Sequence, residues 1–213
     1  MNVQHAVLAG LLVSRALVAQ GACQSFAQPV SGAAIDLAPL SGYVEICGKD
    51  AALCQRLTSG YPPSVVTLAY FLASDEWDAH VRDPSTNFGH YLIAQLAGGM
   101  KPADLPGFKS YVHAQNGTIP DHTQLPSLLQ VNGQASLGIL DESDSSISFG
   151  TVMLLRRGAE PAPIQIVATN SMLATRGRVL SLYVYRTMRD TSDVSAAVRQ
   201  TKQWLACIKA KNG

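Results

Sequence analysis

The chain has 213 residues and a net charge of +1, with 47% hydrophobic and 15% charged residues. This length suits one domain, and the apolar content is sufficient for a core and too high for a disordered chain. The near-neutral balance excludes a global attraction to nucleic acid or to an anionic membrane. We therefore expect no nucleic-acid partner, and any recognition by charge has to be local.

The N-terminal segment resembles a secretory signal peptide. Apolar runs span residues 6–13 and 16–22, and the small residues around Ala27 offer a cleavage site. Two features depart from the pattern, because no basic residue precedes the first run and Arg15 separates the two runs. A buried N-terminal helix or a short membrane anchor is the alternative. We expect residues 1–27 to be removed on export to the periplasm or the cell exterior. We expect no stable membrane span, since no later run reaches about 18 apolar residues.

The four cysteines fit an oxidising compartment. Cys47 and Cys54 enclose six residues, and we predict a disulfide between them. Cleavage after Ala27 would remove Cys23 and leave Cys207 unpaired on the inner face of the last helix. Lipid modification of Cys23 is an alternative, although the aliphatic residue expected three positions earlier is missing. A zinc site at Cys47 and Cys54 is disfavoured, because tetrahedral sites usually show closer pairs and a second pair.

The N-terminal half is predicted to alternate between strands and short helices. Residues 28–42 are expected to be a linker, because prolines and glycines punctuate them. Tyr43–Leu57 has the apolar spacing of a helix, and the prolines of Gly60–Pro63 stop that helix. The elements that follow are a buried strand, a short helix that begins at Ser74, a second strand and two helices. The first strand is Val65–Ala73 and the second is Phe88–Leu96, and the two helices are Ala103–Gln115 and Asp121–Val131.

The C-terminal half predicts an antiparallel meander. Four strand-like runs are separated by short polar, glycine- or proline-containing connections, whereas parallel strands would need long crossovers. These runs are Gln134–Leu140, Ile147–Leu155, Ile164–Leu173 and Val179–Arg186. The last run has apolar or aromatic residues on both faces, which favours a central strand that is covered on both sides.

A final amphipathic helix completes the prediction. Its apolar side chains recur on one stripe from Val194 to Ile208, and Thr191 or Ser192 can cap its start. We expect this helix to lie across the meander. The fold class is therefore α+β, with an antiparallel β-sheet and helices packed on its faces, and residues 43–213 form a single domain.

The run from Ser146 to Ile208, with Val65–Trp77 as an early strand, resembles the PsbP-like α/β/α sandwich. The resemblance covers somewhat over half of the chain and implies an antiparallel sheet with helices on both faces. It also implies an accessory or binding module more than an enzyme, and it transfers no catalytic residue. Through Cys47 and Cys54, followed by Gly60–Pro63, the chain also loosely resembles uncharacterised exported bacterial proteins.

Familiar catalytic and nucleotide-binding motifs are absent from the sequence. There is no G-x-S-x-G, no G-x-x-x-x-G-K-[ST], no G-x-G-x-x-G and no H-E-x-x-H. The histidines match no metal-binding spacing, so we predict no cofactor and no metal. A dispersed active site would escape such a motif search.

The predicted meander gathers charged residues at the two ends of the sheet. One end receives Asp141, Glu142, Asp144, Arg176 and Arg178. The other end receives four arginines: Arg156, Arg157, Arg186 and Arg189. The planar guanidinium fork suits phosphate, sulfate or carboxylate, so these four arginines are the candidate ligand-binding residues. A solvated rim is the alternative interpretation.

We expect an exported binding or accessory module whose partner is a protein or a small anionic ligand. The alternative is an exported hydrolase with a dispersed active site that uses a serine or a histidine. No residue is assigned a catalytic role from the sequence.

Overall fold

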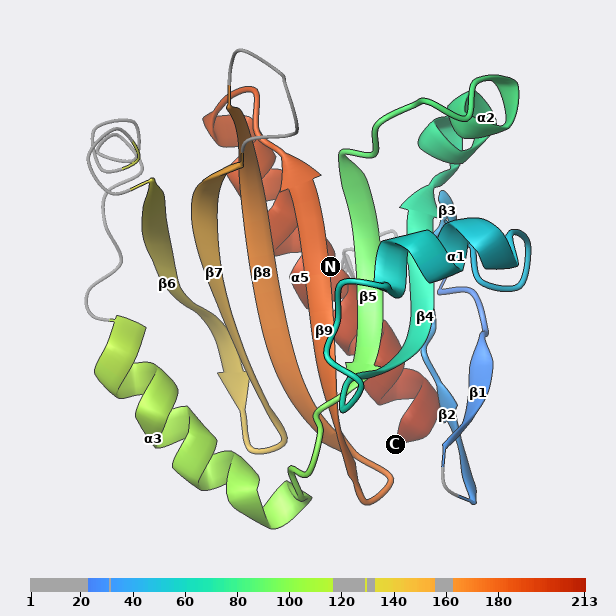
Figure 1. Ribbon diagram of the computed structural model, residues 1–213. Helices are drawn as coiled ribbons and strands as arrows, with labels where there is room; N and C mark the ends of the chain where they lie inside the picture. The colour runs from blue at the N-terminus through green and yellow to red at the C-terminus, as the bar shows by residue number, and fades with distance from the viewer. Residues whose placement is uncertain (1–22, 31, 117–128, 130–132, 156–162) are drawn as a thin grey trace, which may run out of the picture.

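The protein is an antiparallel sheet with helices on both faces (Figure 1). This computed structural model describes residues 23–30, 32–116, 129, 133–155 and 163–213. Most of the predicted leader and of the helix expected at Asp121–Val131 lies outside the described residues. The elements are β1 (Ala27–Val30), β2 (Ala33–Asp36), β3 (Tyr43–Glu45), α1 (Ala51–Thr58), β4 (Val66–Ala73), α2 (Ser74–Arg82), β5 (His90–Leu96), η1 (Pro102–Asp104), α3 (Leu105–Asn116), β6 (Gln134–Ser143), β7 (Ser146–Leu155), β8 (Ile164–Thr175), β9 (Arg178–Thr187) and α5 (Thr191–Asn212).

The main sheet has seven strands in the order β3-β4-β5-β9-β8-β7-β6. The predicted C-terminal meander is confirmed, because β6, β7, β8 and β9 pair consecutively and antiparallel. Strand β9 is central as expected, since its other edge pairs with β5. The predicted α+β class is therefore the observed one.

Helix α5 covers the face of the sheet that we call the back face. Trp204 and Ile208 are buried there with Leu180 and Leu182 of β9, as the stripe on this helix predicts. The expected caps Thr191 and Ser192 are already helical. The N-cap is the residue before them, Asp190, whose carboxylate accepts a hydrogen bond from the Ser192 N–H at 2.7 Å.

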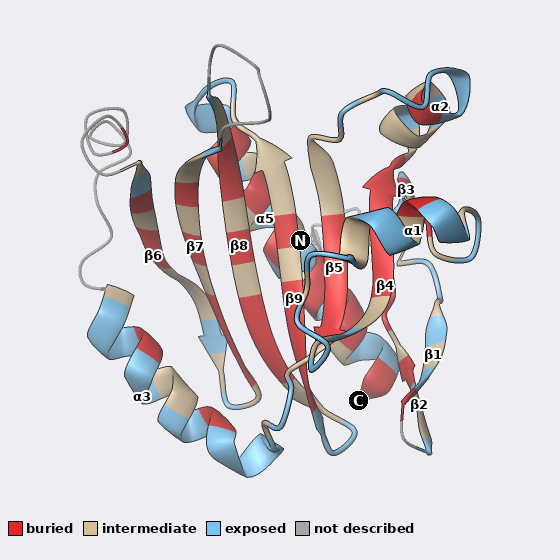
Figure 2. Cartoon of the chain, viewed as in Figure 1, coloured by how far each residue is buried: buried red, intermediate tan, exposed pale blue. Residues whose placement is uncertain are grey.

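Helices α1 and α3 lie on the opposite face, which we call the front face (Figure 1). Leu53 of α1 packs on β4 and β5, whereas Leu105 and Val112 of α3 pack on β7, β8 and β9. Figure 2 shows buried positions along the strands and exposed positions on the outer sides of both helices. Between the two helices Tyr183 and Tyr185 of β9 are only half-buried. The helices therefore cover β9 only partly on this face, whereas the sequence predicts a strand that is covered on both sides.

The prediction of a linker at residues 28–42 is wrong. This segment contains most of the hairpin β1–β2, and it supplies Ile35 and Leu37, which are fully buried against the end of α5. The indole N–H of Trp204 donates to the Leu37 carbonyl at 2.8 Å. Glycine and proline mark the turns of a hairpin as readily as they mark a linker, and composition alone does not separate the two.

Two disulfides join the described cysteines. The predicted Cys47–Cys54 bond is present. The expectation that Cys207 is unpaired is wrong, because Cys207 is bonded to Cys23. A cleavage after Ala27 would remove Cys23 and is incompatible with this bond. The bond also excludes lipid modification of Cys23, since one sulfur atom cannot carry both.

The helical prediction for Tyr43–Leu57 is correct only in its second half. Its first residues form β3, which pairs with β4, and α1 begins at Ala51. The Asp50 carboxylate accepts from the Leu53 N–H at 2.8 Å and sets this start. The remaining predicted strands and helices of the described N-terminal half are present, with small differences in their bounds.

Candidate functional site

A pocket opens on the front face beside α1, and we call it the front pocket. It is a hollow of about 380 Å³, formed between α1, β4, β5 and the segment that follows α2. That volume lies within the range of small-molecule sites. Its lining residues are Leu53, Arg56, Leu57, Tyr70, His80, Pro84, Ser85, Thr86, Asn87, Phe88 and Tyr91.

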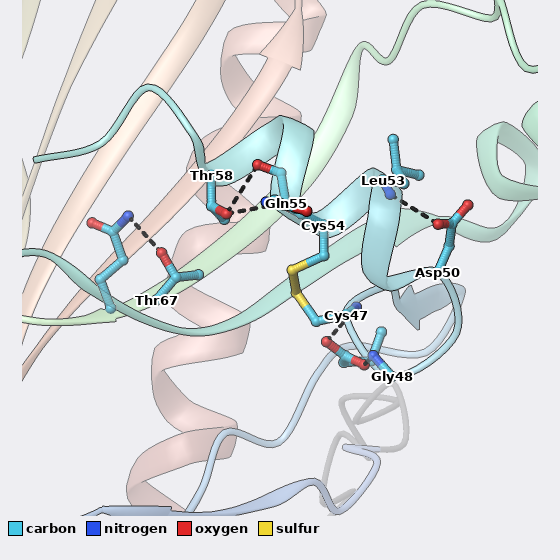
Figure 3. The surroundings of a disulfide bond; sticks show 10 residues. Cys47, Gly48, Asp50, Leu53, Cys54, Gln55, Thr58 and Thr67 are labelled. Carbon is cyan, nitrogen blue, oxygen red and sulfur yellow. Dashed lines mark hydrogen bonds between the residues drawn. A yellow bond between two sulfur atoms is a disulfide. The ribbon is translucent and has the colours of Figure 1, made fainter. Parts of the chain in front are cut away.

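Helix α1, one wall of the front pocket, is fixed at its start by several short-range bonds (Figure 3). The Cys47–Cys54 disulfide ties the first turns of the helix to the preceding loop. The Glu45 carboxylate accepts from the backbone N–H groups of Cys47 and Gly48, at 2.9 and 2.7 Å. These bonds hold a helix of only two turns in one position, and such a short helix would be marginal alone.

Arg56 is the one permanently charged residue among the described residues that line the front pocket. Its side chain is exposed, and its guanidinium makes no hydrogen bond or ion pair within the part of the chain that the structure describes. Leu53 and Leu57 lie on the same helix and contribute apolar wall. The pocket thus combines an uncommitted cation with apolar surface.

His80 closes the inner side of the front pocket. It is 5% exposed, and its ring contacts Trp77 in a tilted arrangement and Phe88 edge-on, with ring centroids 6.1 and 5.2 Å away. Its Nδ1 atom is buried without a hydrogen-bond partner in the described structure. A buried nitrogen without a hydrogen-bond partner lowers the stability of the folded state by about 1–3 kcal/mol.

A row of tyrosines continues the floor of the front pocket across the sheet. Tyr70 stacks on Tyr91 at 5.3 Å, and Tyr91 stacks on Tyr185 at 4.7 Å. Tyr183 follows, 6.2 Å from Tyr185. Burial, with the nearby tyrosines, raises the pKa of Tyr185 above its usual range, so its hydroxyl keeps its proton at physiological pH. The row presents a continuous aromatic surface.

The arginine end expected from the sequence is only partly described. Arg156 and Arg157 lie outside the described residues. Arg186 lies at that edge of the sheet, but its Nε donates to the Asp193 carboxylate at 2.7 Å. The backbone N–H of Arg189 donates to the same carboxylate at 2.9 Å. Asp193 therefore already neutralises Arg186, and a ligand anion would compete with an internal one.

No described helix has the length and apolarity needed to span a membrane. Within the same residues, no three His, Cys, Asp or Glu side chains lie close enough to hold a metal ion.

Comparison with solved structures shows a similarity in fold. No protein family model matches the chain, and no curated protein matches it by sequence. The fold is similar to the crystal structure of the Saccharomyces cerevisiae Ran-binding protein Mog1p, with a TM-score of 0.45 and 12% identity. That similarity covers 89% of this chain and 94% of the other.

The front pocket was not predicted from the sequence. Arg56 follows Cys54 by two positions and looks there like an ordinary solvated residue of a short helix. One signal was available, because Asp50 three residues before Leu53 predicts the helix start and hence the wall. Nothing local indicates that His80, from another helix, faces the same space.

Proposed function

We propose that the protein is an exported binding module that takes up a small organic anion in the front pocket. The observation that carries this proposal is the uncommitted guanidinium of Arg56 in a hollow whose lining combines aliphatic, aromatic and polar side chains. Arg56 pairs with the carboxylate of the ligand, and an apolar body of the ligand lies against Leu53 and Leu57. Guanidinium and carboxylate match in geometry, and the match favours a carboxylate over a neutral group.

Export is supported by the covalent structure. The protein has two disulfides. Disulfides form and persist in oxidising compartments and are rare in cytosolic proteins. The apolar N-terminal runs supply the signal, with a cleavage that must fall before Cys23. These two features together support a periplasmic or secreted location.

A calorimetric titration tests the proposed site. Phenylacetate and hexanoate serve as probes, and phenylacetamide is the uncharged control. We expect Arg56→Gln to weaken phenylacetate binding about ten- to a hundredfold, because a charge-assisted hydrogen bond contributes about 1.5–3 kcal/mol. Phenylacetamide is expected to bind the wild type and this variant equally weakly.

The matched control is Arg199→Gln, which removes one exposed positive charge from α5, far along the chain from the pocket. This variant is expected to bind phenylacetate as the wild type does. Equal affinities of the wild type and the Arg56 variant for both carboxylates would refute the proposed site. A loss only on replacing Arg186 would move the site to the arginine end.

A further inference from the structure

Three side chains form a closed hydrogen-bonded triangle at the tip of the β6–β7 hairpin, away from the front pocket. Lys209 Nζ lies 2.8 Å from the Ser143 Oγ and 2.8 Å from the Ser146 Oγ. The two hydroxyl oxygens are 2.9 Å apart. The serines flank the two-residue turn of the hairpin, and the lysine comes from the last turns of α5.

We propose that Ser143 is a nucleophile for small esters, with Lys209 as its general base and Ser146 as a positioning residue. A hydroxyl in contact with an amine of reduced basicity is the arrangement used by serine–lysine hydrolases on unrelated folds. The proposal is independent of the front pocket and of its ligand.

Accessibility separates the roles of the two serines. Ser143 is half-buried and stands next to the exposed Asp144, so a small substrate can reach its oxygen. Ser146 is fully buried, and its hydroxyl is limited to holding the other two groups in place. The exposed hairpin tip favours small, unhindered acyl groups, because no deep cavity is needed to reach Ser143.

The charges around Lys209 set its protonation. Burial lowers the pKa of its ammonium below the usual 10.5, Asp141 on β6 opposes this shift, and Lys109 on α3 adds to it. Lys109 is itself 3.5 Å from the Glu142 carboxylate. The neutral base is therefore more available at moderately alkaline pH than for an ordinary lysine.

The reaction balances with these groups alone. The Ser143 oxygen attacks the ester carbonyl carbon as its proton passes to neutral Lys209. When the tetrahedral intermediate collapses, the ester C–O bond breaks and Lys209 returns that proton to the departing alkoxide. Water then attacks the acyl-serine through the same base, and the carboxylic acid is released with Ser143 restored. Lys109, whose ammonium donates to the Ser143 and Asp144 carbonyl oxygens, supplies positive charge beside the transient oxyanion.

Covalent labelling of the full chain tests the proposal. A small alkyl fluorophosphonate is incubated with the protein between pH 7 and 10, and the modified peptide is identified by mass spectrometry. We expect one adduct, on Ser143. Its labelling rate is expected to rise with pH and to level off at a pH below the usual lysine pKa of 10.5. Hydrolysis of p-nitrophenyl acetate is expected to be lost when Ser143 is labelled.

Three variants give the test its controls. Lys209→Arg keeps a positive donor near both serines, but the arginine cannot give up its proton. We therefore expect the labelling rate to fall by about a hundredfold or more, while the midpoint of thermal unfolding stays unchanged. Ser143→Ala is expected to abolish labelling, and Ser145→Ala, in the same turn, to leave it unchanged. Absence of an adduct on Ser143, or equal labelling of the wild type and Lys209→Arg, would overturn the proposal.

Discussion

At the residue scale, Asp193 joins the end of β9 to the start of α5. Its carboxylate accepts from the Arg186 guanidinium and from the Arg189 N–H, and its backbone belongs to the capping box of Asp190. Burial alone would raise the pKa of Asp193, but these hydrogen bonds outweigh it and the pKa is lowered. The folded-state pKa therefore lies below the unfolded one. The stabilisation is present above the unfolded pKa, near 3.8, and is lost as the pH falls through the folded value.

Replacing Asp193 by alanine is expected to lower the free energy of unfolding at pH 7 by about 3 kcal/mol, because it leaves the partly buried Arg186 unpaired. Urea unfolding at pH 7 and pH 2 measures this. The difference between the wild type and the variant is expected to shrink at the lower pH. The exposed Asp78 provides the control, and Asp78→Ala is expected to change stability by less than about 0.5 kcal/mol. An equal loss at both pH values would contradict the assigned role.

At the element scale, the sequence predicts what depends on neighbours along the chain. The alternation of apolar and polar residues identifies β6 to β9, and the helical stripe identifies α5, because each pattern reflects one buried face. The prediction of a helix over Tyr43–Leu57 is wrong in its first half for the same reason. A three-residue strand and a two-turn helix are each too short to show their own periodicity. The β1–β2 hairpin was not predicted, because the end of α5 that packs against it lies far away in the sequence.

The contact between that hairpin segment and α5 gives a prediction at this scale. Trp204→Phe keeps an aromatic ring but leaves the buried Leu37 carbonyl without its indole donor. We expect a loss of about 1–3 kcal/mol in the free energy of unfolding. Denaturant unfolding followed by far-ultraviolet circular dichroism measures it. The half-buried Trp77 is the matched control, and the account fails if Trp77→Phe costs as much as Trp204→Phe.

At the scale of the whole molecule, the two disulfides close loops of very different size. Cys23 and Cys207 are 184 residues apart, whereas Cys47 and Cys54 are 7 apart. No local pattern reveals the long-range pair, because only the assembled sheet and α5 bring the two ends together. The same limit applies to the front pocket, whose residues come from four separate segments. The class of fold is therefore readable from the sequence, and the site is not.

Removing each disulfide should have unequal effects. In the chain-entropy description, the longer loop contributes about 5 kcal/mol and the shorter one about 2.5 kcal/mol. We expect the Cys23→Ala/Cys207→Ala double variant to lose more stability than Cys47→Ala/Cys54→Ala, as measured by urea unfolding under non-reducing conditions. The short pair is expected to affect phenylacetate binding more, because it fixes α1. The reverse order in both measurements would argue against the assigned pairing.

The central claim is that the ligand-binding site is the front pocket and not the arginine end of the sheet. The most direct test maps amide chemical-shift changes in the ¹⁵N-labelled protein during titration with phenylacetate. The account predicts that the largest shifts fall on Arg56, Thr86 and Phe88. Shifts concentrated on Arg186 and Arg189, or no shifts at any saturating concentration, would contradict it.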